Sequence, residues 1–247
     1  MSLRDHHERS GTALFRWRSY PPLLLVLLVV AVAFMPVQVH LFGNRFQESW
    51  EVICLLIGVA GLAIRAWVIG HVPQGTSGRN TNSQIADVLN TTGLYSLVRH
   101  PLYVGNFLMW LGPILVLRSP WAALVMLLAF WLYYERIMYA EEEFLRRTFG
   151  EAWTSWAART PAVVPSFKHW TPDLLPFSLR NVLKREYSGV LAVALGFAFA
   201  DWVDDYSTFQ RLVPDTLTLV VLGTGAVAFV VLRTLKKRTT LLEVTGR

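Results

Sequence analysis

The sequence predicts an all-α, polytopic membrane protein with about six membrane segments. Hydrophobic residues make up 53% of its 247 residues and charged residues only 16%, whereas about a quarter of an ordinary soluble protein is charged. Ten Trp, eight Tyr and fourteen Phe fit a protein that meets lipid at headgroup level, where amphipathic rings settle. This composition excludes a disordered chain, a disulfide scaffold and a soluble nucleic-acid binder, although the net charge is +6.

Several apolar stretches are long enough to cross the membrane as helices, which takes about 20 residues for about 30 Å of hydrocarbon. The apolar region 101–139 is interrupted at Arg118-Ser119-Pro120. Because Pro suits the first turn of a helix, we predict two helices there, 101–117 and 120–139. They form a hairpin that either spans the membrane or re-enters it. The other predicted spans are 21–42, 50–70, 187–203 and 213–232.

The basic residues are distributed unequally across these spans. Eighteen of the 23 Lys and Arg residues lie on the side of the two termini, and three lie on the other side. The positive-inside rule therefore predicts that both termini are cytoplasmic. On this topology Arg65 lies near the cytoplasmic end of its span, where a long side chain can extend into water. Residues 201–205, which contain three Asp, are expected to form a solvated acidic loop outside.

One polar stretch with candidate chemistry runs from residue 75 to residue 103. A helix is expected to begin at about Pro101, with Arg99 and His100 at its entrance. Backbone N–H groups and the helix dipole favour an anion at that position. Tyr103 and Asn106 then follow on one face of the helix. An equally open interpretation is that these side chains only anchor a helix end at the membrane interface.

The second polar stretch begins at Glu141-Glu142-Glu143, directly after the apolar helix 120–139. Glu141 and Glu142 project about 100° apart on a helix. At least one carboxylate should therefore face the membrane core, where it needs a cationic partner. Glu143 is expected to be solvated. The alternative is that all three are solvated and paired with Arg146 and Arg147.

The two stretches together, RHPLYVG at 99–105 and AEEEFLRRTFGEAW at 140–153, resemble a known superfamily. It contains the membrane-embedded isoprenylcysteine carboxyl methyltransferases and phospholipid methyltransferases, and the resemblance covers residues 50–167. It implies an enzyme that binds S-adenosyl-L-methionine at the cytosolic face and methylates a lipid or a lipidated, isoprenylcysteine-like acceptor. The catalytic residues that we predict are Arg99 and Arg136, and no metal site is predicted. The implied cofactor-binding residues are Asn80, Leu89, Tyr95, His100, Pro101, Tyr103 and Glu141.

The chemistry of these residue types agrees with that cofactor. Arg99 and His100 can meet its carboxylate, and Glu141 can hold its ammonium. Tyr95 and Tyr103 can stack on adenine or face the sulfonium by a cation–π contact.

One position departs from the family pattern, in which an arginine lies four residues before the glutamate. This position is Ile137 here, with Arg136 beside it. Either Arg136 substitutes through its long reach, or the acceptor carries no carboxylate at that point.

Four regions follow along the chain. Residues 1–20 are a cytoplasmic segment, and 21–49 contain the first span and an outer loop. Residues 50–167 are the methyltransferase-like core, and 168–247 contain two further spans.

We expect a bacterial inner-membrane protein whose acceptor enters sideways from the bilayer. Phe107, Trp110 and Trp131 would border the lipid chain.

Two other functions stay open. One is an NADPH-dependent sterol or enone reductase-like enzyme. Such reductases usually carry Asn in place of Leu102 and an acidic residue in place of Asn106, and the 71–100 loop offers only Arg79 and Arg99 for the extra phosphate. The other is a non-catalytic scaffold or transporter, which would have little need for the long polar loop.

Overall fold

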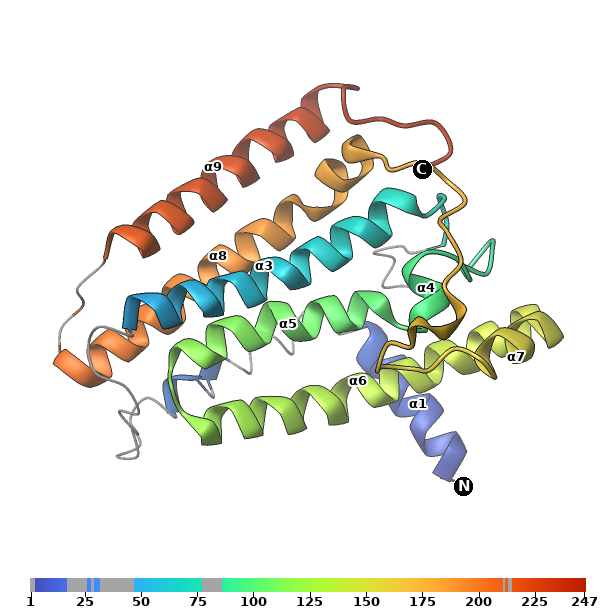
Figure 1. Ribbon diagram of the computed structural model, residues 1–247, viewed down its shortest axis with the longest axis horizontal. Helices are drawn as coiled ribbons and strands as arrows, with labels where there is room; N and C mark the ends of the chain where they lie inside the picture. The colour runs from blue at the N-terminus through green and yellow to red at the C-terminus, as the bar shows by residue number, and fades with distance from the viewer. Residues whose placement is uncertain are drawn as a thin grey trace.

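The computed structural model describes residues 3–16, 26–27, 29–31, 47–76, 86–210, 212 and 215–247. All regular structure within these ranges is helical, which confirms the all-α prediction (Figure 1). The longer helices run side by side as one bundle, while the short ones gather at one end. The helices are α1 (Leu3–Arg16), α3 (Gln47–His71), α4 (Leu94–Leu97), α5 (Pro101–Val116), α6 (Pro120–Phe149), α7 (Glu151–Ala157), the 3-10 turn η2 (Phe167–His169), α8 (Leu179–Phe209) and α9 (Thr216–Arg238).

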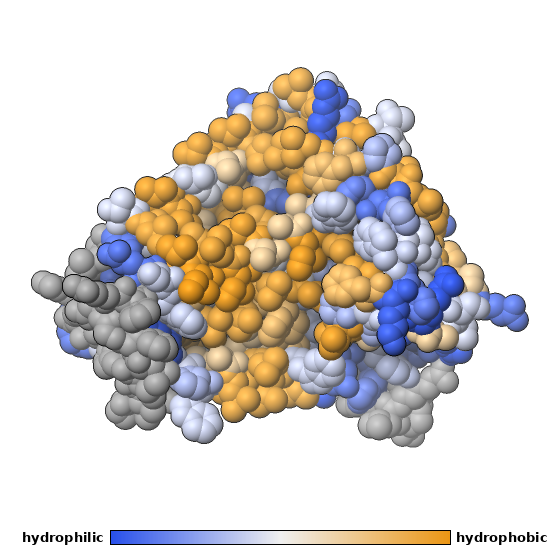
Figure 2. Space-filling model, viewed as in Figure 1, coloured by the Kyte–Doolittle hydropathy of each residue, from blue (hydrophilic) through white to orange (hydrophobic). Residues whose placement is uncertain are grey.

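Four of these helices are long and apolar enough to cross a membrane, namely Glu48–His71, Pro120–Phe149, Leu179–Ser207 and Thr216–Arg238. The polytopic prediction is therefore confirmed, and α5 is a shorter apolar helix of 16 residues. Apolar side chains cover the middle of the face seen in Figure 2, and polar ones gather toward its ends. The predicted span 21–42 lies largely outside the described residues.

The predicted hairpin is present and turns at residues 117–119. α5 begins at Pro101 and α6 begins at Pro120, as expected from proline at the first helical position. Ser119 caps α6 by accepting a hydrogen bond from the Ala122 N–H, 3.3 Å. α6 does not end at residue 139, because it continues without a break through the three glutamates to Phe149. The carboxylates therefore sit on a rigid helix and not on a loop.

Glycines let α3 and α5 approach each other closely. A Cβ at Gly61 would collide with the backbone of Gly105 and Met109. Gly105 has a second role, because the side chain of Arg65 passes over it. This close contact places the start of α5 directly against the last part of α3. We call the end of the bundle where α3 ends and α5 begins the loop end.

The predicted span 187–203 lies within α8, but the helix is longer and the expectation for residues 201–205 is wrong. The helix begins at Leu179, eight residues before the predicted span, where the Ser178 side chain caps it by accepting from the Asn181 N–H, 3.4 Å. It also runs through residues 201–205, so no solvated acidic loop exists there. Asp201 is buried and accepts a hydrogen bond from Thr218 of α9, 2.8 Å, and Asp204 forms an ion pair with Arg118. These acids face neighbouring helices, which satisfies them inside the bundle.

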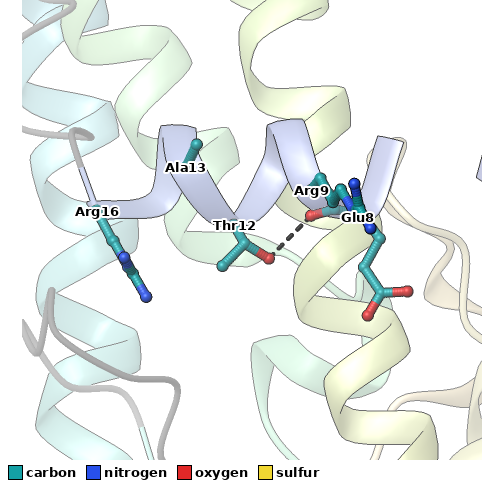
Figure 3. A pocket seen from close by; sticks show the side chains of 5 residues that line it. All are labelled: Glu8, Arg9, Thr12, Ala13 and Arg16. Atoms are coloured by element: carbon teal, nitrogen blue, oxygen red, sulfur yellow. Dashed lines mark hydrogen bonds between the residues drawn. The ribbon is translucent and has the colours of Figure 1, made fainter. Parts of the chain in front are cut away.

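Helix α1 crosses α6 at the loop end (Figure 3). Gly11 packs directly on the α6 backbone at Arg136 and on the side chain of Ala140, where no larger residue would fit. Glu8 pairs with Arg147 at 2.8 Å. The exposed side of α1 carries a shallow pocket of about 440 Å³, lined by Glu8, Arg9, Thr12, Ala13 and Arg16.

Candidate active site

The RHPLY motif lies at the loop end in a short extended segment between α4 and α5. His100 is the residue before α5, with φ −121° and ψ 59°, and Pro101 is buried in the first turn. The backbone N–H of Arg99 donates to the Pro161 carbonyl, 2.8 Å, and that of His100 donates to the Ala162 carbonyl, 3.3 Å. The segment after α7 thus holds the backbone of the motif in place.

Arg99 is bonded to the protein through its whole guanidinium group. Its Nε donates to Glu142 Oε1 at 2.8 Å and its Nη2 to Glu142 Oε2 at 3.4 Å. Its Nη1 donates to the carbonyls of Ala157 and Thr160 at 2.9 and 3.0 Å. These contacts join α6 and the end of α7 to the RHPLY segment.

His100 lies between two glutamates. Its Nε2 is 2.9 Å from Glu142 Oε1, and its Nδ1 is 3.6 Å from Glu141 Oε2. Burial favours the neutral ring, but the hydrogen bonds and charges of Glu141 and Glu142 outweigh that desolvation. The pKa of His100 therefore lies above its ordinary value. The nearer of the two carboxylates is that of Glu142.

Glu141 faces Tyr103 across the gap between α6 and α5. The Tyr103 hydroxyl donates to Glu141 Oε2 at 2.9 Å, and the Tyr103 ring stacks on His100 with centroids 5.5 Å apart. The Glu141 side chain is 34% exposed, against 22% for Glu142 and 5% for His100. Of the three ionisable groups at this site, Glu141 is thus the one most open to a ligand.

Tyr95 completes the cluster from α4. Its carbonyl accepts a hydrogen bond from Trp156 Nε1, 3.1 Å. Burial, followed by the charge of Glu141, raises the pKa of the Tyr95 hydroxyl. The structure therefore brings together six of the predicted residues: Tyr95, Arg99, His100, Pro101, Tyr103 and Glu141.

The other predicted residues do not join this cluster. Arg136 lies in the row of α6 that faces α1, since Gly11 packs on its backbone. Ile137, the position of the family arginine, is fully buried. Leu89 is partly buried in the segment 86–90, and Asn80 lies outside the described residues.

Two charged residues differ from expectation. Arg65 does not extend into water, because it forms a buried ion pair with Glu186 of α8 at 2.7 Å and also donates to Asn106 Oδ1 at 2.7 Å. Glu143 is not solvated, since its carboxylate accepts from Arg146 and Arg147 at 2.8 and 3.1 Å and is largely buried. The interpretation that the glutamates pair with these two arginines is correct for Glu143 alone.

Sequence reasoning missed two residues that border the site, Tyr134 and Glu186, whereas it placed Asn106 beside Tyr103 on one helix face. Asn106 Nδ2 donates to the Tyr134 hydroxyl at 3.1 Å, and the Tyr134 ring lies 4.8 Å from that of Tyr103. Tyr134 lies two helical turns before Glu141, so its spacing on α6 could have identified it. Glu186 carries no local signal, because only the packing of α8 against α3 brings it to Arg65.

Comparisons with known proteins agree with this site. A family model described as phospholipid methyltransferase matches residues 51–152, which contain both motifs except the last residue of the second, Trp153. Protein-S-isoprenylcysteine O-methyltransferase B of Arabidopsis thaliana is 39% identical over 79 residues, 31% of this chain and 39% of that protein. No solved structure matches the chain significantly.

Two bacterial relatives match over a longer region. The cobalt-zinc-cadmium resistance protein CzcN of Cupriavidus metallidurans is 35% identical over 154 residues, 58% of this chain and 66% of that protein. The nickel-cobalt-cadmium resistance protein NccN of Alcaligenes xylosoxydans xylosoxydans is 30% identical over 154 residues, 60% of this chain and 62% of that protein. The chain spans about two thirds or less of the length of these relatives. With both motifs inside the matched region and assembled at one site, the chain belongs to the superfamily of membrane methyltransferases that includes the phospholipid and isoprenylcysteine methyltransferases.

Proposed function

We propose that the protein is an S-adenosyl-L-methionine-dependent methyltransferase that acts on a lipid or a lipidated acceptor at the cytosolic membrane face. The observation that carries this proposal is the position of Glu141, which is partly open and lies beside Tyr103 and His100 where α5 begins. The family match includes all three residues. The class of acceptor and the orientation in the membrane are part of the proposal.

The residues present fit the cofactor. A partly exposed carboxylate suits an ammonium group, and Glu141 is such a carboxylate. The ring of Tyr103, which is partly buried beside Glu141, is an aromatic group that suits an aromatic base or a sulfonium. When bound, S-adenosylmethionine would supply an activated methyl group. The protein would bind and orient the reactants and exclude water.

The contacts of Arg99 with Glu142 support a role for Arg99 that differs from the catalytic role predicted from the sequence. Arg99 is bonded to Glu142 and to two carbonyls, and Glu142 in turn holds His100. We infer that Arg99 positions Glu142 and His100, and that its contribution to catalysis is indirect. Nothing in the arrangement supports a catalytic role for Arg136, whose row on α6 faces α1.

The orientation follows from charge. The positive-inside bias of the sequence places the loop end, with the site, in the cytoplasm. We further propose a bacterial inner membrane as the location. The two relatives that match over 154 residues come from bacteria, which supports this assignment.

Equilibrium binding to the purified protein in detergent tests the proposal. We expect saturable binding of S-adenosylmethionine and none of NADPH. Binding of NADPH alone would support a reductase, and binding of neither would support a scaffold or transporter. A methyl-transfer assay with radiolabelled cofactor and membrane lipid extracts would then identify the class of acceptor.

A further inference from the structure

The segment 161–178 between α7 and α8, which we call the strap, crosses the loop end of the bundle. Its backbone is bonded at several points. Ser166 N donates to the Leu97 carbonyl and Thr171 O accepts from Gly93 N, at 2.9 and 2.8 Å. Ser178 N donates to the Gly70 carbonyl at 2.9 Å. The strap is therefore fixed to α3 and to the turn that contains α4.

Although its backbone is fixed, the strap points large apolar side chains outward. Val164, Phe167 and Leu174 are 77%, 78% and 82% exposed, and Trp170 is also exposed. The basic side chain of Lys168 is exposed beside them. A patch of several large apolar side chains exposed on one segment is unusual on a surface that faces only water, and it marks contact with a membrane or a partner.

The patch continues onto the lipid-facing surface of the bundle. Trp67 of α3, itself exposed in the apolar span, donates through Nε1 to Asp173 Oδ2 at 3.1 Å. The Phe177 ring lies 5.3 Å from the ring of His71 and packs on Gly70. The strap is thus joined to the end of a membrane-spanning helix both by a polar contact, through Asp173, and by the ring of Phe177.

Helix length puts the strap at headgroup level. The span Glu48–His71 has 24 residues, which corresponds to about 36 Å. The hydrocarbon core is only about 30 Å thick. The end of α3 therefore reaches the interfacial region, and the strap is bonded to that end.

We propose that the strap is inserted into the interfacial region of the leaflet at the loop end. Val164, Phe167, Trp170 and Leu174 lie among the headgroups and upper acyl chains, as expected for aromatic and aliphatic anchors. Lys168 extends to the lipid phosphates. This inference concerns the membrane contact of the protein and does not depend on the proposed methyl transfer.

Spin labelling tests the proposal in lipid nanodiscs that contain anionic phospholipid. The chain has one cysteine, Cys54, which is fully buried, and Cys54→Ala provides the background. Phe167→Cys and Leu174→Cys each receive a nitroxide label, and collision rates with oxygen and with a water-soluble nickel chelate are measured. Ser155→Cys, on the exposed polar side of α7, is the aqueous control. Val227→Cys, exposed on α9, is the lipid control.

For both strap positions we expect an oxygen-to-nickel collision ratio several-fold above that of the residue 155 label and closer to that of the residue 227 label. Ratios equal to that of residue 155 would overturn the proposal and leave the patch to a soluble partner. Because the substituted side chains are exposed, the variants should fold. Val164→Cys offers a third position if one of them does not.

Discussion

The guanidinium group of Arg65 and the carboxylate of Glu186 form a two-point ion pair inside the bundle, with Nε–Oε2 at 2.9 Å and Nη2–Oε1 at 2.7 Å. Arg65 also holds Asn106, which bonds Tyr134, and the Tyr134 ring contacts Tyr103. A continuous set of contacts therefore leads from α8 to the hydroxyl that holds Glu141. α8 lies outside the residues that match the phospholipid methyltransferase model, yet it supports the candidate site.

We predict that Glu186→Gln lowers both stability and cofactor affinity. Removal of one partner leaves the Arg65 charge buried, which costs about 3 kcal/mol or more. Loss of the fixed Arg65 loosens Asn106 and Tyr134, and we expect several-fold weaker cofactor binding, on the order of 1 kcal/mol. Thermal unfolding in detergent and equilibrium binding measure the two effects.

The matched control for this variant is Asp204→Asn. Asp204 lies on α8 as Glu186 does, but at the end of the helix away from the site. The substitution removes its buried ion pair with Arg118. This variant should lose stability but keep the cofactor affinity. If both variants weaken cofactor binding equally, the cause is a general loosening of the bundle. The contacts through Asn106 then do not link Glu186 to the cofactor site.

A second prediction concerns the charge of Glu141. Glu141→Gln preserves the size of the side chain, so a charge-assisted bond to the cofactor ammonium becomes an ordinary one. We expect a loss of about 1.5–3 kcal/mol, or roughly ten- to a hundredfold in affinity. A cofactor analogue that lacks the amine should bind the wild type and the variant about equally.

The control for Glu141 follows from the structure. Glu143 is unsuitable because it is buried and paired with Arg146 and Arg147. Glu151 begins α7 and is exposed, so Glu151→Gln should leave binding unchanged. Equal cofactor affinity for wild type and Glu141→Gln, with the fold intact, would contradict the assignment of Glu141 to the cofactor ammonium.

Whether the sequence predicts a feature of this site depends on how far apart in the chain the interacting residues lie. Pro101 and Pro120 mark helix starts through local backbone geometry, and both starts are confirmed. Helical spacing also separates Glu141 from Glu142, and the structure gives them different partners, Tyr103 and Arg99. These features depend on a few adjacent residues.

The partners of the charged residues in the spans depend on helix packing, and there the sequence fails. An arginine near a helix end could reach water, but α8 brings Glu186 to Arg65 first. Asp201 similarly faces Thr218 of α9 and not solvent. Such pairs join residues far apart in the chain, so composition and spacing contain no signal for them.

The third prediction is a pH dependence of stability that arises from His100. Its pKa is raised in the folded protein, above an ordinary value of about 6.5. The folded state therefore binds this proton more tightly than the unfolded state. The resulting stabilisation is complete below the unfolded pKa and is lost as the pH rises through the folded pKa.

Thermal unfolding between about pH 6 and about pH 9 measures this effect. The wild type should exceed His100→Gln in unfolding temperature most at the acidic end, and the difference should shrink as the pH rises. His169→Gln, on the exposed strap, is the control and should follow the wild type. A difference that grows with pH would contradict the raised pKa.

The fourth prediction concerns topology. In the Cys54→Ala background, Gln210→Cys reports the end of α8 and Ser155→Cys reports α7, and both positions are exposed. The positive-inside rule predicts that a membrane-impermeant maleimide added to intact bacterial cells labels residue 210 and spares residue 155. After the cells are permeabilised, both should react. The reverse pattern would place the candidate site outside.

The last prediction concerns the lipid chain of the acceptor and rests on the proposed function. Aromatic rings form a continuous row between α5 and α6. Trp110 and Phe107 contact Phe130, with centroids 6.2 and 5.2 Å apart, and Phe130 stacks on Tyr134 at 4.1 Å. Tyr134 then contacts Tyr103 at the site. This row provides an apolar path from the middle of the membrane to Glu141.

We expect Phe130→Ala to raise KM about tenfold for an acceptor with a long acyl or prenyl chain, because part of its apolar contact is lost. A short-chain analogue should be affected little, and the cofactor affinity should stay at the wild-type value. Trp131 is 46% exposed on the adjacent position of α6, outside these ring contacts. If Trp131 borders the lipid chain, Trp131→Ala should raise KM for the long-chain acceptor as Phe130→Ala does. If the chain follows the row of rings, Trp131→Ala should leave KM unchanged. If Phe130→Ala changes KM equally for long and short acceptors, the row only packs α5 against α6, and the lipid chain reaches Glu141 by another path.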